Sequence, residues 1–276
     1  MSLQIKKMLS QKKLFSLLYH DIFDYPLTSE ELNKWLAGNI ISKKGVNIDF
    51  SDGYYFLKGR KKLVKKRLKR ARYSKKKFSI AQKKALLIAK IPTVKFIGIT
   101  GSLAMNNCKI DSDIDFILVT KSHTLWITRL FVYLLLLITR TKVRHPKDSI
   151  ENNKLCLNIW MDELNLKINK KNIYTAHELA QIKPLVDKGN IFSELIYANS
   201  WILNYWPNAV NLSKTFSGKS ELNKKNTCFL IKFLNKLFFK AQLFYMKPKH
   251  TNEKTTLFQA FFHPNDLSIK VLKRLG

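Results

Sequence analysis

Two apolar segments, separated by a Gly-Ser pair and a nine-residue gap, constrain the fold of this chain more than any other feature. The first, residues 93–100, is rich in β-branched side chains, and the second, residues 112–119, carries two aspartates two positions apart. Both segments are typical of buried strands, and Gly101-Ser102 predicts a tight turn where the backbone can approach a ligand. Because side chains alternate along a strand, Asp113 and Asp115 point the same way and could share one hard divalent cation such as Mg²⁺.

The Gly-Ser pair, the gap and the Ser-Asp-x-Asp sequence before an apolar strand resemble the polymerase-beta-type nucleotidyltransferase superfamily. The resemblance covers roughly residues 75–165 and implies an α+β fold, a mixed β-sheet with flanking helices. It implies that Gly101 and Ser102 bind the nucleoside triphosphate, while Asp113 and Asp115 are catalytic residues that hold Mg²⁺. Superfamily members often carry Arg-Gly soon after the Gly-Ser pair, whereas Met105-Asn106 stand at those positions here.

A third carboxylate is the part of the site that the resemblance leaves open. The superfamily usually supplies it from a neighbouring strand, as the general base that activates the acceptor hydroxyl. The matching stretch, residues 155–162, predicts a strand that sends Asn158 and Asp162 to the same face. Either Asn158 occupies the third site without a carboxylate, or a shift of register makes Asp162 the base. We favour Asn158 slightly, because Asp162 lies roughly 13 Å farther along the strand, at its end.

Three regions are expected along the chain. Residues 1–58 predict a winged-helix-like module, with a helix that Thr28 caps and a hairpin turn at Asp52-Gly53. The module either binds DNA or packs against the enzyme, and we favour packing because a clear third helix before the hairpin is missing. Residues 59–186 form the expected nucleotidyltransferase catalytic domain. Residues 187–276 form the expected helical C-terminal region, which would close the cleft and select the acceptor.

Residues 60–90 predict one long basic helix. Its apolar positions, Leu68 among them, are expected to face the core, with Arg70 and other cations on the remaining sides. The chain has 50 basic and 19 acidic residues, a net charge of +31, and no acid between Gly53 and Ile110. The helix is therefore a candidate surface for binding nucleic acid. Compositional drift explains the charge equally well, because only 8 of the basic residues are Arg.

The cysteines and the apolar runs of the sequence predict the cellular compartment of the protein. Cys108, Cys156 and Cys228 lack metal-type spacing and predict reduced thiols in a cytoplasmic protein. Lysines interrupt every apolar run near the N-terminus, so no signal peptide is expected. The longest apolar run, residues 130–138, is shorter than the roughly 20 residues that span a bilayer, so no transmembrane segment is expected.

A further helix is predicted to begin at residues 174–178, and its two conspicuous polar residues have structural interpretations. Thr175 and Glu178 have the spacing of a capping box, so Glu178 is interpreted as structural. His177 is interpreted as a packing or hydrogen-bonding residue, which is the commoner role of a lone histidine.

The leading hypothesis is a Mg²⁺-dependent nucleotidyltransferase. It would move a nucleoside monophosphate from a nucleoside triphosphate, such as ATP, to an unidentified hydroxyl or acidic acceptor. This chemistry depends on positioning and on neutralising phosphate charge, which metal ions held by carboxylates supply. The alternative hypothesis is a nucleic-acid-binding protein with a degenerate nucleotidyltransferase domain, and a third is an interaction protein without either activity.

Overall fold

The chain folds around a six-stranded mixed β-sheet in the computed structural model, which describes residues 3–38, 40, 45–144, 148, 152–212, 228–246, 254–262 and 267–275. The sheet has the order β6-β3-β4-β5-β8-β7, with strands β3 (Val94–Ile99), β4 (Ile114–Thr120), β5 (Leu155–Asp162), β6 (Lys183–Asp187), β7 (Lys254–Thr255) and β8 (Gln259–Phe261). A separate hairpin joins β1 (Ile48–Ser51) and β2 (Tyr54–Leu57). The helices are α1 (Leu3–Asp21), α2 (Ser29–Lys34), α3 (Lys62–Ile88), α4 (Gly101–Ala104), α5 (Leu125–Ile138), α6 (Ile173–Ala180), α7 (Ile191–Ala198), the 3₁₀ helix η1 (Ser200–Asn204), α9 (Phe229–Met246) and α10 (Leu267–Leu275). The predicted α+β class is therefore confirmed.

Strand β4 lies in the interior of the sheet, antiparallel to β3 and parallel to β5. A strand with neighbours on both edges and helices over its faces needs a nearly continuous apolar sequence, which β4 has. Every residue of β4 is buried except Asp115, which is partly exposed. Asp115 is thus a carboxylate inside an otherwise apolar strand, a costly placement that requires partners.

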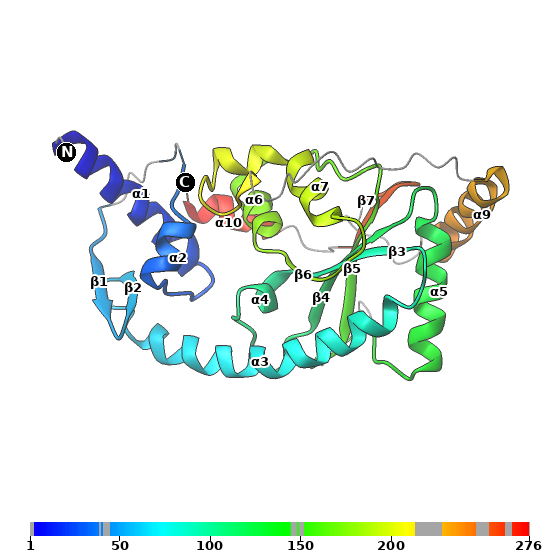
Figure 1. The fold of residues 1–276 in the computed structure, drawn as a ribbon. Helices are drawn as coiled ribbons and strands as arrows, with labels where there is room; N and C mark the ends of the chain where they lie inside the picture. The colour runs from blue at the N-terminus through cyan, green and yellow to red at the C-terminus, as the bar shows by residue number, and fades with distance from the viewer. Residues whose placement is uncertain are drawn as a thin grey trace.

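Helix α3 is continuous, as predicted, and runs along the molecule from the β1-β2 hairpin to the sheet (Figure 1). Its buried face differs from the prediction. Leu68 is 48% exposed, whereas Arg67, Arg70 and Lys77 are buried. Arg67 is paired there with Glu31 of α2 at 2.6 Å. The prediction was wrong at these positions because half of α3 faces polar groups of the N-terminal region and of a loop, not an apolar core.

Three polar side chains of α3 hold the loop that links the Gly-Ser turn to β4. They recur at steps of four and three residues, so they lie on one face of the helix. Buried polar groups must be hydrogen-bonded, and each of the three has a partner in the loop. The bonds are Arg70 Nη1 to Asn107 Oδ1 (3.1 Å), Cys108 N to Ser74 Oγ (3.1 Å) and Lys77 Nζ to the Ser112 carbonyl (2.7 Å).

The N-terminal region contains two of the predicted features. Thr28 and Glu31 form the expected capping box at the start of α2. The hairpin turn at Asp52-Gly53 has positive φ at both residues, 54° and 82°, as a tight hairpin turn requires. The region shares one buried apolar cluster with the sheet, so it packs against the rest of the chain. The sequence lacks a clear third helix before the hairpin. Residue 39 and residues 41–44 of that stretch lie outside the described residues.

The C-terminal region differs from the purely helical prediction. Strand β8 pairs with β5, and β7 pairs with β8, so this region completes the sheet. Strands of two and three residues are too short to show a periodic pattern, which is why the sequence did not reveal them. The first helices of this region in the described ranges are α7 and η1. None of the helices in the described ranges is both long and apolar enough to cross a membrane.

A buried cluster of aromatic and imidazole rings joins α1, α2 and α6. His177 of α6 stacks on Trp35 with ring centroids 4.1 Å apart, and its Nε2 lies 3.2 Å from Nε2 of His20 in α1. Burial lowers the pKa of His20 to about 3 and also holds the pKa of His177 well below its ordinary value. Both rings are therefore neutral in the folded protein, as His177 in a packing role would be.

Replacing His177 with Gln should change how stability depends on pH. In the unfolded chain a histidine takes up a proton near pH 6.5, whereas in the folded chain the low pKa keeps the buried ring neutral. Each buried histidine therefore lowers the free energy of unfolding by about 1.4 kcal/mol per pH unit below 6.5. The free energy of unfolding should differ most between wild type and H177Q near neutral pH. This difference in the free energy of unfolding should narrow by about 1.4 kcal/mol per pH unit toward pH 5.

Urea unfolding at several pH values measures this gap. All other titrating groups are common to both proteins, including buried carboxyls that change stability with pH in the opposite direction. The two proteins are therefore compared with each other at each pH. A gap that stays the same from neutral pH to pH 5 would contradict the assignment.

Candidate functional site

The predicted site residues Asp115 and Gly101 lie in direct contact where β3 ends and β4 begins. A Cβ atom built on Gly101 would lie 2.6 Å from Asp115 Oδ2, closer than side-chain carbons approach other atoms. Gly101 also has φ +61°, a left-handed conformation that favours glycine. The glycine is therefore needed twice, for its backbone conformation and for the space that the carboxylate occupies.

Asp113 and Asp115 bring their carboxylates close together where β4 begins. Their carboxylate oxygens and Cys156 Sγ all lie within 4.8 Å of one another. Arg144 Nη1 donates a hydrogen bond to Asp113 Oδ2 at 2.8 Å, which partly balances the local negative charge. Sequence reasoning named neither Cys156 nor Arg144 for the site, because only the parallel pairing of β4 with β5 brings Cys156 opposite Asp115.

The structure separates the two candidates for the third position. The pairing of β4 with β5 is irregular between residues 116 and 117, and Asn158 is the extra residue of β5. Asn158 Nδ2 donates to Asp115 Oδ1 at 2.8 Å, and its Oδ1 is buried without a hydrogen-bond partner among the described residues. Asp162 pairs with Thr120 at the far end of the strand. Its carboxylate accepts hydrogen bonds from the backbone N–H groups of His123 (2.6 Å) and Leu164 (2.9 Å).

Ser102 is exposed at the start of the short helix α4. Its Oγ lies 3.3 Å from Cys108 Sγ, and its carbonyl accepts a hydrogen bond from Asn107 N at 2.8 Å. The turn that carries Ser102 is thereby tied to the same loop that α3 holds, so the position of the hydroxyl is fixed by buried contacts behind it.

A cavity of about 400 Å³ opens over Asp115. Its walls come from the Gly-Ser turn, the first half of β5, helix α6, the N-terminal region and the start of α10. Figure 1 shows α6 and α10 between the N-terminal region and the sheet. The residues that line it are His20, Phe23, Tyr25, Thr100, Gly101, Ser102, Met105, Asn107, Asp115, Arg144, Asn158, Tyr174, His177, Glu178, Gln181 and Leu267.

The interpretation of Glu178 as a capping residue is wrong. Helix α6 begins at Ile173, and Asn172 is its N-cap, because the Asn172 side chain accepts the hydrogen bond from Thr175 N. Glu178 therefore lies inside the helix, where no capping role exists, and its side chain lines the cavity. The spacing from Thr175 matched a capping box by coincidence, since Asn172 competes for the same role one turn earlier.

Negative charge is concentrated and poorly solvated around this cavity. Burial, together with the nearby carboxylates of Asp113 and Glu178, raises the pKa of Asp115 to about 8. Burial raises the pKa of Glu178 to about 7, although the hydrogen bond from Gln181 opposes the shift. Burial and the two aspartates also raise the pKa of the Cys156 thiol, so the sulfur remains protonated and neutral. Crowded carboxylates of this kind are stabilised when a cation binds between them.

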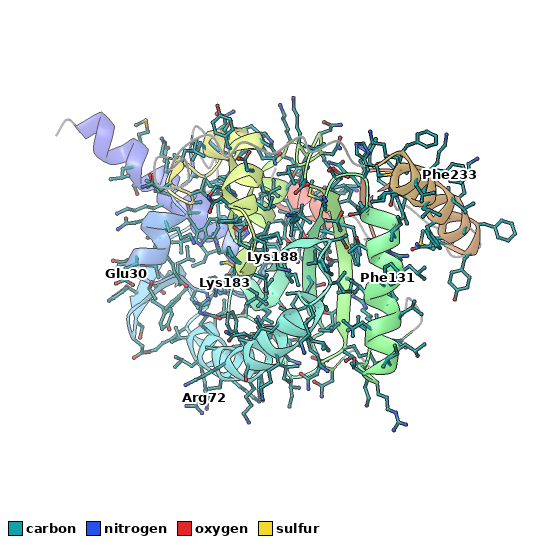
Figure 2. The ribbon with its side chains drawn as sticks, turned by 45° about the vertical axis from the view of Figure 1, so that its right-hand side comes forward. Glu30, Arg72, Phe131, Lys183, Lys188 and Phe233 are labelled. Carbon is teal, nitrogen blue, oxygen red and sulfur yellow. The ribbon has the colours of Figure 1, made fainter. Side chains whose placement is uncertain are left out.

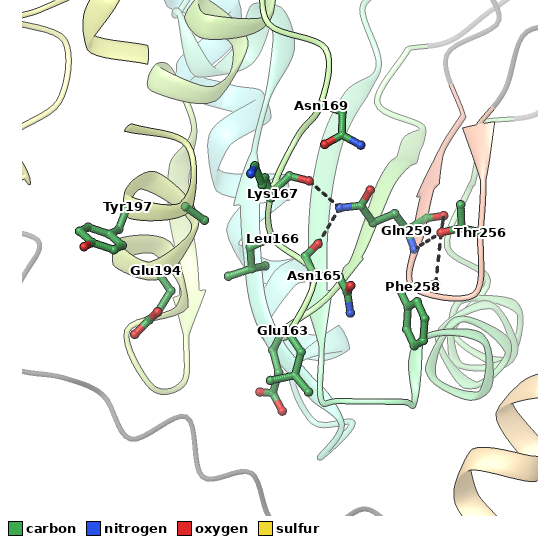
Figure 3. Close-up of a pocket in the computed structure, with 12 residues that line it drawn as sticks. Glu163, Asn165, Leu166, Lys167, Asn169, Glu194, Tyr197, Thr256, Phe258 and Gln259 are labelled. Carbon is green, nitrogen blue, oxygen red and sulfur yellow. Dashed lines mark hydrogen bonds between the residues drawn. The ribbon is translucent and has the colours of Figure 1, made fainter. Parts of the chain in front are cut away.

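A second, larger cavity of about 550 Å³ lies elsewhere on the molecule (Figure 3). It is lined by residues of the β5–α6 connection, α7 and the β7-β8 hairpin, and contains none of the predicted site residues. Gln259 in its wall donates from Nε2 to the carbonyls of Asn165 (2.6 Å) and Lys167 (2.9 Å). These bonds hold the β5–α6 connection against the hairpin, which is a structural role.

Neither a scan against protein-family models nor a search of curated proteins finds a match for this sequence. The case for a function therefore depends on the geometry described above.

Replacing Gly101 with Ala should destabilise the fold more than the same change at Gly59. Both glycines have positive φ, +61° and +82°, so alanine costs about 1–2 kcal/mol of backbone strain at either position. A Cβ at Gly59 meets nothing within 4 Å, whereas a Cβ at Gly101 meets Asp115 Oδ2. The overpacking at Gly101 should cost a further 1–3 kcal/mol, roughly.

Urea unfolding of G101A and G59A measures this difference, with G59A as the control for backbone strain. Equal free energies of unfolding for the two variants would show that the contact between Gly101 and Asp115 does not constrain the fold.

Proposed function

We propose that this chain is a Mg²⁺-dependent nucleotidyltransferase of the polymerase-beta type. The observation that carries the proposal is the contact of Asp115 with Gly101 beneath an open cavity, with Asp113 on the same side of the strand. A carboxylate in an otherwise buried strand costs stability, so a fold that retains one beside a second carboxylate has a use for both.

The donor atoms fit a hard divalent cation. Asp113 and Asp115 supply carboxylate oxygens, which Mg²⁺ prefers, and the protonated Cys156 thiol is a poor competitor for such an ion. The buried Oδ1 of Asn158 has no protein partner among the described residues and is a further oxygen at this place. Asp113 and Asp115 would hold the ion, which neutralises the negative charge that develops on the transferred phosphoryl group.

The chain's own groups would position the reactants. The Gly-Ser turn would bind the triphosphate, and Arg144, which lines the cavity, supplies positive charge next to the carboxylates. In the transfer, an acceptor oxygen forms a bond to the α-phosphorus while the bond between that phosphorus and the bridging oxygen breaks, and pyrophosphate leaves. The walls from α6, the N-terminal region and α10 would limit which acceptor can enter.

Replacing Asp113 or Asp115 with Asn should abolish triphosphate turnover while leaving the chain folded. The amide has the same shape as the carboxylate but lacks its charge. Turnover should fall by about 100-fold or more, since even the outer partners of metal ligands cost 10–100-fold when they are changed. Asp111 is a matched control, because it lies two residues before Asp113 and is exposed.

The measurement is Mg²⁺-dependent release of pyrophosphate from ATP, GTP, CTP and UTP by wild type, D113N, D115N and D111N. The site assignment would be wrong if D113N and D115N turned over triphosphate as fast as D111N.

A second candidate function, nucleic-acid binding, is favoured by the outer face of α3. Six cations recur on that face at steps of three, four or seven residues and are all exposed, over a helix about 40 Å long. Figure 2 shows Arg72 on this face, which points away from the molecule. No carboxylate of the described residues pairs with any of them. They are Lys62, Lys65, Lys69, Arg72, Lys76 and Lys83.

Replacing Lys65, Lys69 and Lys76 together with Gln should weaken nucleic-acid binding and reduce its salt dependence. Each phosphate neutralised on duplex DNA contributes about −0.9 to the slope of log K against log salt, so the triple variant should have a slope smaller by roughly 2 to 3. The control is the triple change of Lys232, Lys236 and Lys240 on α9, which removes the same charge from another exposed helix face.

Fluorescence anisotropy with labelled duplex DNA and RNA over a range of salt concentrations gives both slopes. If the two triple variants lost affinity equally, the net charge of the chain and not the α3 face would account for binding.

A further inference from the structure

One face of α6 forms part of the wall of the cavity that Gly101 and Ser102 also line. Tyr174, His177, Glu178 and Gln181 recur at steps of three, one and three residues, and all four line the cavity. Helical geometry places residues with this spacing on one side of a helix. The wall is rigid, because the Asn172 cap holds the start of α6 and the ring cluster around His177 holds its middle.

Only two carboxylates line the cavity among the described residues, Asp115 and Glu178. Gln181 Nε2 donates to Glu178 Oε1 at 2.6 Å, which fixes the side chain. No basic side chain of the described residues forms an ion pair with Glu178, so its second oxygen is not committed to a cation. Glu178 is close enough to Asp115 to raise the pKa of that residue.

The other polar groups of the cavity are poorly suited to accept a proton. An amide has no basic lone pair, and the amide of Asn158 is used to hold Asp115. His177 stacks on Trp35 and contacts His20, so the ring is confined by the packed cluster. Arg144 remains protonated and is paired with Asp113. The strand position at which a third carboxylate was expected therefore carries no base, and the other carboxylate that lines the cavity beside Asp115 is Glu178 on α6.

We propose that Glu178 of α6 is the general base of the transfer, in place of a carboxylate on β5. The inference rests on the proposed function. As the acceptor oxygen bonds to the α-phosphorus and pyrophosphate leaves, the hydroxyl proton passes to the Glu178 carboxylate. Burial favours this role, because a carboxyl group with a pKa near neutrality is a stronger base than an exposed one.

This assignment also gives the acceptor a direction of approach. The triphosphate would lie on the Gly-Ser side of the cavity and the acceptor on the α6 side, beside Tyr25 and Tyr174, which line the same space. With a cavity of about 400 Å³ shared by both, the acceptor group that reaches Glu178 must be slender, such as a primary or secondary hydroxyl on a flexible or small molecule. Water is the smallest such acceptor and is always present.

The test compares wild type, Glu178→Gln, Asp115→Asn and Glu30→Gln, with water as the acceptor. The probe is whichever of ATP, GTP, CTP and UTP wild type converts fastest to monophosphate and pyrophosphate in Mg²⁺. Affinity is measured separately with the α,β-methylene analogue of that nucleotide, which cannot be cleaved at the α-phosphorus. Glu30 is a matched control because it is exposed on α2, away from the cavity.

E178Q should lower the turnover number by about 10²–10⁴, the usual effect of removing a general base, while the affinity for the Mg²⁺ complex of the analogue stays near that of wild type. The amide keeps an oxygen for Gln181 and removes a poorly solvated charge, so the variant should fold. A second variant, E178A, opens space for formate, and added formate should restore part of its turnover but none of that lost in D115N.

Each other result overturns the inference in a recognisable way. If E178Q turns over like wild type while D115N does not, Glu178 is not the base and the proposed function stands. If E178Q loses affinity for the analogue in step with turnover, and formate does not rescue E178A, Glu178 binds substrate instead. If wild type neither releases pyrophosphate nor binds the analogue in Mg²⁺, the proposed function fails and the inference fails with it.

Discussion

The attachment of α3 to the loop before β4 is the constraint on which the rest of this structure depends. Arg70, Ser74 and Lys77 are buried polar groups of α3, and each forms a hydrogen bond with this loop. Because an unsatisfied buried polar group costs about 1–3 kcal/mol, the three bonds fix the loop with little freedom. The loop in turn sets where Ser102 and Asp113 stand, and so the shape of the candidate site.

The same helix joins the N-terminal region to the sheet. Arg70 also donates to the Phe23 carbonyl (3.2 Å), and Asn107 donates to that carbonyl (3.0 Å), so one backbone oxygen connects the N-terminal region, α3 and the site loop. This arrangement explains why the N-terminal region forms part of the cavity wall. A region that only packed against the sheet would stabilise the fold, whereas one that lines the cavity can also influence what enters it.

The candidate site holds carboxyl groups in poorly solvated positions, and neighbouring groups reduce the free-energy cost of that burial. Asp115 is tolerated because Asn158 donates to one oxygen and Gly101 leaves space for the other. Asn158 places a neutral amide next to Asp115, where Asp113 and Glu178 already raise the pKa of that residue. The base proposed on α6 lines the same cavity as Asp115 but lies on a different element.

The sequence by itself determined the strands around the Gly-Ser pair, the capping box at Thr28, the hairpin turn and the continuity of α3, because each depends on local spacing and backbone preference. It also predicted that the carboxylates of Asp113 and Asp115 could share one ion, and in the structure an oxygen of each lies within 4.8 Å of the other. Only the tertiary structure decided the rest. The pairing of β4 with β5 and the extra residue at Asn158 brought an amide to Asp115 and left Asp162 at the far end of the strand. The N-cap at Asn172 and the packing of α6 turned Glu178 into the cavity. Those outcomes depend on contacts between residues far apart in the chain, and periodicity within a segment carries no information about them.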